Sequence, residues 1–334
     1  MNSSRLQVEE YKKGILSGNR VMLARAITLV ESTLPDDQNL AGEILDVIIP
    51  YTGNSLRIGI TGSPGVGKST FIESFGKTIT ESGKKIAVLT VDPSSQITRG
   101  SILGDKTRME ELGKNPMAFI RTTPSGQTLG GIAGHTRETI LLCEAAGFEI
   151  IVIETVGVGQ SEFSVKSMVD FFLLLMLAGS GDDLQGIKKG IIEMADAMAV
   201  TKADGENIKR ANATMADFQQ ALHLLQPQSS GWTPKVVTCS AIHSKGIVDI
   251  WNMIQQFKKE MESSHLFEIN RQNQQSFWFD EHFQTLLAMD HLKFPSVQSK
   301  RDALKTLVQT KKISARKAAQ DLLDKYHQAV SSKR

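Results

Sequence analysis

The stretch Gly62-Ser63-Pro64-Gly65-Val66-Gly67-Lys68-Ser69 decides the fold class. It follows the apolar run Ile58-Gly59-Ile60-Thr61, and a sequence with helical character begins near Thr70. The pattern G-x-x-x-x-G-K-[ST] between a strand and a helix is typical of a loop that binds phosphate groups. Its glycines let several backbone N–H groups point at phosphate oxygens, and the helix N-terminus adds partial positive charge. The stretch predicts a phosphate-binding loop, the P-loop, at residues 62–70.

Two side chains of the P-loop carry specific roles in this interpretation. Lys68 would reach the outer phosphates of a nucleotide, and the Ser69 hydroxyl would ligate a magnesium ion. The alternative is a glycine-rich turn without a ligand.

Composition excludes several classes of protein. The chain has 334 residues, 40% of them hydrophobic and 22% charged, and a formal net charge of +2. This charge is too small to indicate a nucleic-acid surface or a membrane patch. The two cysteines, Cys143 and Cys239, are far apart and form neither a disulfide framework nor a cysteine metal site. The first residues lack the apolar core of a signal peptide, and the apolar run at 171–178 is too short to span a bilayer. We therefore expect a cytoplasmic (or organelle-matrix) protein.

Changes in residue composition and hydrophobic periodicity divide the chain into three parts. Residues 1–54 show helical periodicity and form an N-terminal helical extension with Asn19 as a helix cap. Residues 55–262 alternate short β-rich runs with helical stretches and form the nucleotide-binding domain. Residues 263–334 return to charged helical sequence and form a C-terminal helical arm, whose apolar stripes pack in a core or against a partner subunit.

Seven near-continuous apolar runs predict a mostly parallel central sheet covered by helices on both faces. The predicted strands are Arg57–Thr61, Lys85–Val91, Ala118–Arg121, Glu149–Glu154, Phe171–Leu177, Ala197–Thr201 and Val236–Cys239. Ligands of such folds bind at the carboxyl ends of the strands. The chain is thus predicted to be a P-loop nucleotide hydrolase of the α/β class.

An acidic residue ends the fourth predicted strand in the sequence Glu154-Thr155-Val156-Gly157. A carboxylate at this strand end holds magnesium through water, and the Gly157 N–H can contact the terminal phosphate. Val158 follows, where small signalling GTPases carry the glutamine that orients the attacking water. Because Gln160 lies further along, we expect slow intrinsic hydrolysis that depends on a partner.

The sequence Thr201-Lys202-Ala203-Asp204 follows the sixth predicted strand and matches the guanine-reading pattern [NT]-K-x-D. The Asp204 carboxylate can accept hydrogen bonds from the N1–H and the exocyclic amine of guanine, both of which adenine lacks. An unpaired buried acceptor costs about 1–3 kcal/mol or more, so adenine would be disfavoured. Lys202 would lay its aliphatic stem along the base. The alternative is an ordinary helix start.

The sequence Cys239-Ser240-Ala241-Ile242 follows the seventh predicted strand. A backbone N–H in the turn formed by Ser240, Ala241 and Ile242 can support the guanine O6 atom. On its own this stretch would indicate only a strand-to-helix turn. Together with the P-loop, Glu154 and Asp204, in this order, it favours a guanine nucleotide site.

Two further stretches lie where nucleotide-sensing segments would be expected. Asp92 ends the second predicted strand, and Gly104-Asp105-Lys106-Thr107-Arg108-Met109 comes after it. Asp92 and Asp105 could ligate magnesium directly or through water, and Arg108 could meet phosphate charge. As isolated residues they would equally serve as turn and cap residues.

These motifs together resemble a known family. The P-loop, Val91-Asp92-Pro93-Ser94-Ser95, Gly104–Met109, Glu154-Thr155-Val156-Gly157-Val158-Gly159-Gln160-Ser161-Glu162 and Thr201–Asp204 stand in the order found in the MeaB/ArgK GTPases. These are bacterial relatives of the methylmalonic aciduria type A protein. The resemblance covers about residues 10–260 closely and the C-terminal arm more loosely.

The resemblance implies a homodimeric, metallochaperone-like GTPase that uses GTP, GDP and Mg²⁺. Family members associate with adenosylcobalamin-dependent acyl-CoA mutases, usually methylmalonyl-CoA mutase, gate delivery of the cofactor, and protect or reactivate the mutase. The resemblance makes the stretch 179–196 a third switch, with Asp182 and Lys188 as coupling candidates. It also implies dimer contacts in the C-terminal helices, and Thr201 stands where most GTPases have Asn.

Three alternatives remain open on the sequence. A metabolite or protein kinase, as in the older arginine-transport kinase annotation of such proteins, needs a positioned base and an acceptor pocket, and no motif marks one. A nickel- or cobalt-insertion GTPase needs clustered His or Cys, whereas the seven histidines are scattered. A nucleotide sensor without catalysis would show no turnover.

Overall fold

The computed structural model describes residues 6–92, 109–124, 131–155, 161–179, 189–223 and 231–332. One compact unit extends to Gln274, and a second comprises the described residues from Gln275 onward. The three-part division predicted from the sequence stays a prediction.

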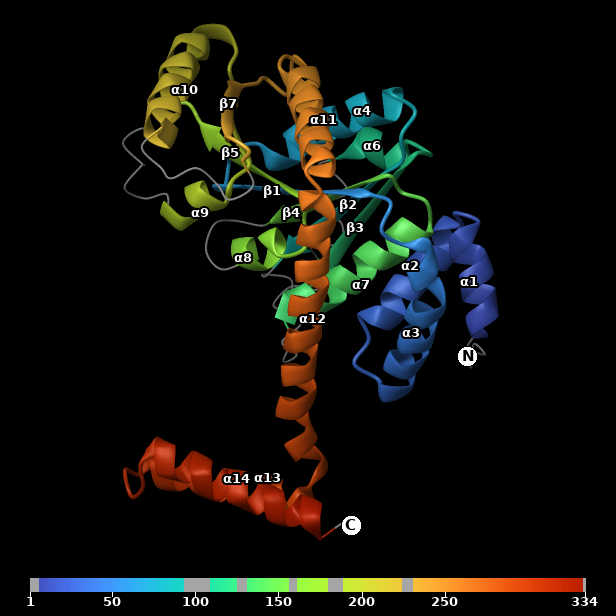
Figure 1. The fold of residues 1–334 in the computed structure, drawn as a ribbon, viewed down its shortest axis with the longest axis vertical. Helices are drawn as coiled ribbons and strands as arrows, with labels where there is room; N and C mark the ends of the chain where they lie inside the picture. The colour runs from blue at the N-terminus through green and yellow to red at the C-terminus, as the bar shows by residue number, and fades with distance from the viewer. Residues whose placement is uncertain are drawn as a thin grey trace. The chain divides into compact units, whose positions relative to one another are not determined.

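The first unit is built on a seven-stranded parallel sheet (Figure 1). Its strand order is β3-β2-β4-β1-β5-β6-β7, so β1, which leads into the P-loop, is central. The strands are β1 (Leu56–Gly62), β2 (Ile86–Asp92), β3 (Ala118–Pro124), β4 (Ile150–Thr155), β5 (Phe171–Leu177), β6 (Ala197–Thr201) and β7 (Lys235–Thr238). The predicted α/β fold with a mostly parallel sheet is confirmed.

Helices cover both faces of the sheet. Successive strand residues point to opposite faces, and because apolar side chains occur on both, each face is buried by helices. On one face, Leu173 and Leu175 of β5 join a core completed by α4 (Lys68–Glu81), α6 (Glu110–Lys114) and α11 (Ile247–Ser263). On the other, Leu174 and Met176 join a core completed by α9 (Lys189–Met194) and α10 (Ile208–His223). The continuous apolar run of β5 follows from this double burial.

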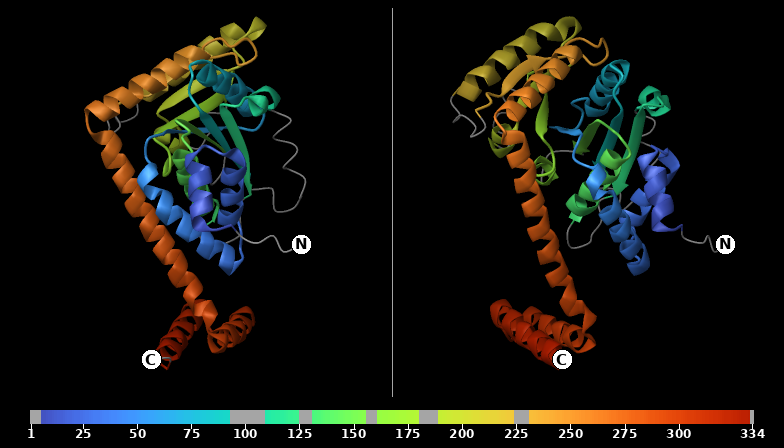
Figure 2. Two further views of the ribbon diagram at one scale, coloured as in Figure 1. Left: turned by 90° about the vertical axis from the view of Figure 1, so that its right-hand side faces the viewer. Right: turned by 45° about the vertical axis from the view of Figure 1, so that its right-hand side comes forward.

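The N-terminal helices lie beside α7 (Gly131–Ala145), as Figures 1 and 2 show. They are α1 (Val8–Leu16), α2 (Arg20–Val30) and α3 (Pro35–Ile48), followed by the 3-10 turn η1 (Ile49–Tyr51). Asn19 caps α2 as predicted, because its side chain accepts the Val21 and Met22 N–H groups. The buried stripe Leu23, Ala26, Ile27 and Val30 forms the packing face of α2.

A buried charge cluster lies at the amino end of β1. Arg57 donates from Nε and Nη2 to the Glu144 carboxylate of α7, at 2.9 and 3.0 Å. Asp170, just before β5, receives Arg271 Nε and Nη2 at 2.5 and 2.6 Å and the Arg57 N–H at 2.8 Å. Burial alone would raise the pKa of Glu144, but the charge and hydrogen bonds of Arg57, the Ser55 hydroxyl and the Arg271 charge hold it below its usual value. The start of α12 (Leu266–Asp290) is thereby joined to the sheet.

The second unit contains the later part of α12 and a helix pair. The helices α13 (Pro295–Gln309) and α14 (Ala315–Ser331) pack side by side after the 3-10 turn η4 (His291–Lys293), as Figure 2 shows. Phe294 and Tyr326 meet edge to face at 5.7 Å, and the Tyr326 hydroxyl donates to Asp290 at 2.5 Å. Within the described residues, no helix combines the length and apolar character needed to cross a membrane.

Candidate nucleotide-binding site

The P-loop joins the carboxyl end of β1 to the start of α4, as the sequence predicts. Gly62 lies so close to β5 that an added Cβ atom would come within 2.5 Å of the Leu175 carbonyl oxygen. Gly67 precedes the first residue of α4 with φ of 96°, a conformation that favours glycine. The two glycines therefore let the chain turn tightly from strand to helix, and Val66 between them is fully buried.

The side chain of Lys68 folds back onto the loop that precedes it, and its ammonium group contacts the loop backbone. Its Nζ donates to the Gly62 carbonyl at 2.7 Å and to the Ser63 carbonyl at 3.3 Å. Burial lowers the pKa of Lys68, and the charges of Glu154 and Glu162 oppose this shift. The ammonium group thus lies within the P-loop, where a phosphate group would replace the backbone carbonyls as its partner.

Ser69 and Glu154 come together at the boundary between β1 and β4. Parallel pairing places Ile60 of β1 beside Glu154, and the Ser69 hydroxyl donates to Glu154 Oε1 at 3.3 Å. Thr155 and Thr61 join the same strand ends through their hydroxyls at 2.8 Å. Hydroxyl and carboxylate oxygens are ligands that Mg²⁺ prefers, so these two residues fit the expected ion.

The other residues expected near the magnesium ion and the terminal phosphate fall largely on parts of the chain that the structure does not describe. Gly157, Asp105 and Arg108 lie outside the described residues, as does the side chain of Asp92, whose backbone ends β2. Val158, Gln160, Asp182 and Lys188 lie outside them too. Among the residues that the structure does describe, no cluster of three or more His, Cys, Asp or Glu forms a metal site.

The predicted base-reading residues converge from the ends of β6 and β7. The buried Ser240 hydroxyl donates to Asp204 Oδ2 at 2.5 Å, and the Ala203 N–H donates to the Cys239 carbonyl at 3.0 Å. Ala241 is partly buried and Ile242 is largely exposed in the turn that follows. Asp204 is therefore held by the same turn that the sequence predicts to contact a guanine base.

Two contacts join the base-reading turn to the P-loop. Lys202, with the unusual φ of 55°, donates from Nζ to the Gly65 carbonyl at 2.9 Å. Thr201 is buried, and its hydroxyl lies 2.7 Å from the Val66 carbonyl and 3.1 Å from the Met176 carbonyl. The motif indicated Thr201 only as a substitute for Asn, and the sequence carries no signal for the carbonyls it contacts.

A parallel sheet with this loop at the end of its central strand, and an acidic residue at the end of the neighbouring strand, defines the class of P-loop nucleoside triphosphatases. Residues 23–293 match the family model "Methylmalonyl Co-A mutase-associated GTPase MeaB". The chain belongs to this family and is a GTPase, as the resemblance implied.

Relatives from distant organisms support the assignment. The chain is 50% identical over 261 residues to "GTPase ArgK" of Escherichia coli, covering 78% of this chain and 79% of that protein. It is 43% identical over 327 residues to "Methylmalonic aciduria type A homolog, mitochondrial" of Mus musculus, covering 95% and 79%. A solved structure titled "Crystal structure of LAO/AO transport system kinase" has a TM-score of 0.75 at 36% identity, covering 97% of this chain and 98% of that one.

Replacing Thr201 by Val tests the contact between the base-reading turn and the P-loop. The isosteric change removes the only donor that Thr201 offers to the Val66 and Met176 carbonyls. We expect the free energy of unfolding to fall by about 1–3 kcal/mol in chemical denaturation, because buried acceptors lose a partner. Thr201→Ser keeps the hydroxyl and is the matched control. If both variants lost the same free energy of unfolding, the hydroxyl would contribute nothing to stability.

Proposed function

We propose that the site binds guanine nucleotides and hydrolyses GTP, with residues 62–70 on the phosphates and Asp204 on the base. The observation that carries the proposal is the joining of the two halves: Lys202 reaches Gly65, while Ser240 holds Asp204. A base read at Asp204 would therefore stand in a defined position relative to the P-loop.

The chemistry of the site divides among the residues of this chain. Lys68 and the backbone N–H groups of the P-loop stabilise the charge that develops on the phosphate oxygens. Gly157 would offer its N–H to the terminal phosphate, and Arg108 would add positive charge. A magnesium ion held by Ser69 and Glu154, with Asp92 and Asp105 as further ligands, would neutralise phosphate charge. Because Val158 cannot orient water by hydrogen bonding, the intrinsic rate is slow.

Asp204→Asn tests the guanine assignment through a change of base preference. An amide at this position can accept from N1–H but would oppose the exocyclic amine of guanine with its own N–H₂. Xanthine carries an oxygen in place of that amine, so it would gain a hydrogen bond. We expect GDP affinity to fall by about a hundredfold or more and XDP affinity to rise, measured by calorimetry.

The control for this experiment is Glu206→Gln, an exposed change two residues away in the 3-10 turn η3 (Gly205–Asn207). It should leave both affinities unchanged. Asp204→Asn protein that keeps its GDP affinity and gains none for XDP would contradict the role of Asp204.

We also propose that nucleotide state gates loading of adenosylcobalamin into an acyl-CoA mutase, with methylmalonyl-CoA mutase as the client, and helps to protect or reactivate it. The family description names methylmalonyl-CoA mutase, and the mouse relative's name refers to methylmalonic aciduria; both support this client. Val158 has no polar side chain that could orient the attacking water. This supports the proposal that hydrolysis depends on a partner.

Addition of methylmalonyl-CoA mutase to the purified protein should raise the steady-state rate of GTP hydrolysis by about tenfold or more, because a partner would complete the site. Transfer of adenosylcobalamin should in turn depend on the nucleotide supplied. Lys68→Ala, which removes the phosphate-binding ammonium, should show no stimulated hydrolysis. A rate that is unchanged by saturating mutase would count against the client.

We further propose a homodimer in which the exposed apolar side chains of α12 meet those of a second copy. Phe279, Phe283, Leu286 and Leu287 are each at least half exposed, and the first two rings stack at 6.2 Å. Four large apolar side chains at helical spacing form a patch of the kind that a partner covers.

Phe283→Glu should convert the dimer into a monomer, because the interface would have to bury an unpaired carboxylate. Light scattering after size exclusion should then give the chain mass of 36.6 kDa in place of twice that value. Lys305→Glu, an exposed change on α13, is the control that should remain dimeric. Wild-type protein that is monomeric at micromolar concentration would contradict the proposal.

A further inference from the structure

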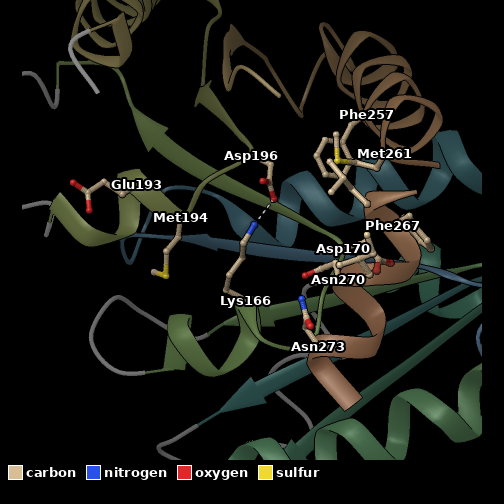
Figure 3. Close-up of a pocket in the computed structure, with 12 residues that line it drawn as sticks. Lys166, Asp170, Glu193, Met194, Asp196, Phe257, Met261, Phe267, Asn270 and Asn273 are labelled. Atoms are coloured by element: carbon tan, nitrogen blue, oxygen red, sulfur yellow. Dashed lines mark hydrogen bonds and ion pairs between the residues drawn. The ribbon is translucent and has the colours of Figure 1, made fainter. Parts of the chain in front are cut away.

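A cavity of about 510 Å³ lies at the opposite end of the sheet from the P-loop. It is lined from the ends of α8 (Ser161–Lys166), α9 and α11, from the start of α12, and from the residues that precede β5 and β6 (Figure 3). The P-loop and Asp204 instead follow the carboxyl ends of their strands. The cavity is therefore separate from the nucleotide site, and its volume suits a small ligand.

One wall of the cavity is apolar. Phe257 and Met261 come from α11, and Leu266 and Phe267 come from the start of α12. Phe257, Met261 and Phe267 lie on the right of Figure 3. Asn270 and Asn273 follow one turn apart along α12 and bring amide groups to the same cavity. The wall therefore suits a ligand with an apolar body and a polar end that accepts or donates hydrogen bonds.

The opposite side of the cavity holds an ion pair between a partly exposed lysine and a buried aspartate. Lys166 Nζ lies 2.6 Å from Asp196 Oδ2, and the Phe172 N–H donates to the same oxygen at 2.7 Å. The Asp196 side chain is only 5% exposed, yet the residue lines the cavity. Both bonds use Oδ2, which leaves Oδ1 as the carboxylate oxygen that can accept a bond from a ligand.

The electrostatics favour a cation at this oxygen. Burial raises the pKa of Asp196 despite the opposing charge of Lys166, so a second positive group would stabilise the carboxylate. The described lining residues include three carboxylates, Asp170, Asp196 and Glu193, against the single ammonium of Lys166. The Arg271 guanidinium matches the Asp170 carboxylate, whereas Asp196 keeps Oδ1 for a ligand because both of its hydrogen bonds use Oδ2.

We propose that this cavity binds an organic cation, an amine or guanidinium group carried on an apolar chain. The cationic group would donate to Asp196 Oδ1 and to the Asn270 or Asn273 carbonyl, while the chain would pack against Phe257, Met261 and Phe267. The cation comes either from a free small molecule or from a basic side chain of a bound protein, and the two share this chemistry.

The place of the ion pair in the fold connects the cavity with the GTPase site. Lys166 ends α8, which begins directly after residues 156–160, and Asp196 immediately precedes β6, which ends at Thr201. A ligand on Asp196 would therefore act on two elements that lead to nucleotide-binding segments. The proposal does not depend on which nucleotide binds there.

Titration of the full chain with n-hexylammonium chloride, followed by NMR or calorimetry with and without GDP, tests the proposal. Neutral 1-hexanol of the same chain length should bind at least about tenfold more weakly, because it lacks the charge-assisted bond to Asp196. Equal binding of the two probes would overturn the proposal, whatever the outcome for guanine recognition at Asp204.

Two variants of exposed residues make the test specific without disturbing the core. Asn273→Phe fills the mouth of the cavity and should abolish n-hexylammonium binding, whereas Gln272→Phe, one position away and not lining the cavity, should retain it. Asp196→Asn should weaken binding about tenfold or more, provided that its GDP affinity shows a folded protein. Binding that survives Asn273→Phe would overturn the proposal.

A second pair of probes separates the two sources of the cation. A short leucine-rich peptide with one central lysine is compared with the same peptide carrying norleucine in its place. If the lysine peptide binds more tightly than n-hexylammonium and its binding depends on the lysine, the cation belongs to a partner protein. If n-hexylammonium binds more tightly than the lysine peptide, the cation belongs to a free amine. Peptides that bind equally well, together with equal binding of the two small probes, would leave a purely apolar cavity and contradict the proposal.

Discussion

The candidate site depends on the parallel pairing of β1 with β4 on one side and β5 on the other. This pairing brings Glu154 beside the end of β1 and places the Leu175 carbonyl where only a glycine at position 62 avoids a clash. The phosphate loop, its acidic neighbour and the tight turn are thus consequences of one arrangement of three strands. A shift of register by one residue would reverse which side chains face each helix layer and separate Ser69 from Glu154.

The opposite end of the same strands carries the buried charges. Arg57, Glu144, Asp170 and Arg271 satisfy one another there, and Lys166 with Asp196 forms a second pair nearby. Buried pairs such as Arg57–Glu144 and Arg271–Asp170 contribute little net stability but are costly to break, so they favour one arrangement of the packed elements. The depressed pKa of Glu144 means that its contribution is present above its ordinary pKa and is lost as the pH falls through the lower value in the folded protein.

Sequence reasoning located all seven strands because each is a short apolar run next to a turn or helix signal. It also identified the P-loop and Asp204, because each belongs to a motif of adjacent residues. It missed the Arg57 cluster, although a charged residue inside an apolar strand run was a usable signal. It could not find the Thr201 contacts or the Lys166–Asp196 pair, since their partners are distant in the chain and carry no pattern.

The sequence by itself determined the order of strands and helices along the chain, the phosphate-binding loop and the family. These depend on local periodicity and on motifs of a few adjacent residues. Only the tertiary structure decided the strand order, the joining of Lys202 and Thr201 to the P-loop, and the cavity at the amino ends of β5 and β6. Contacts between residues far apart in the chain arise from packing, and packing depends on the whole set of burial and hydrogen-bonding constraints at once.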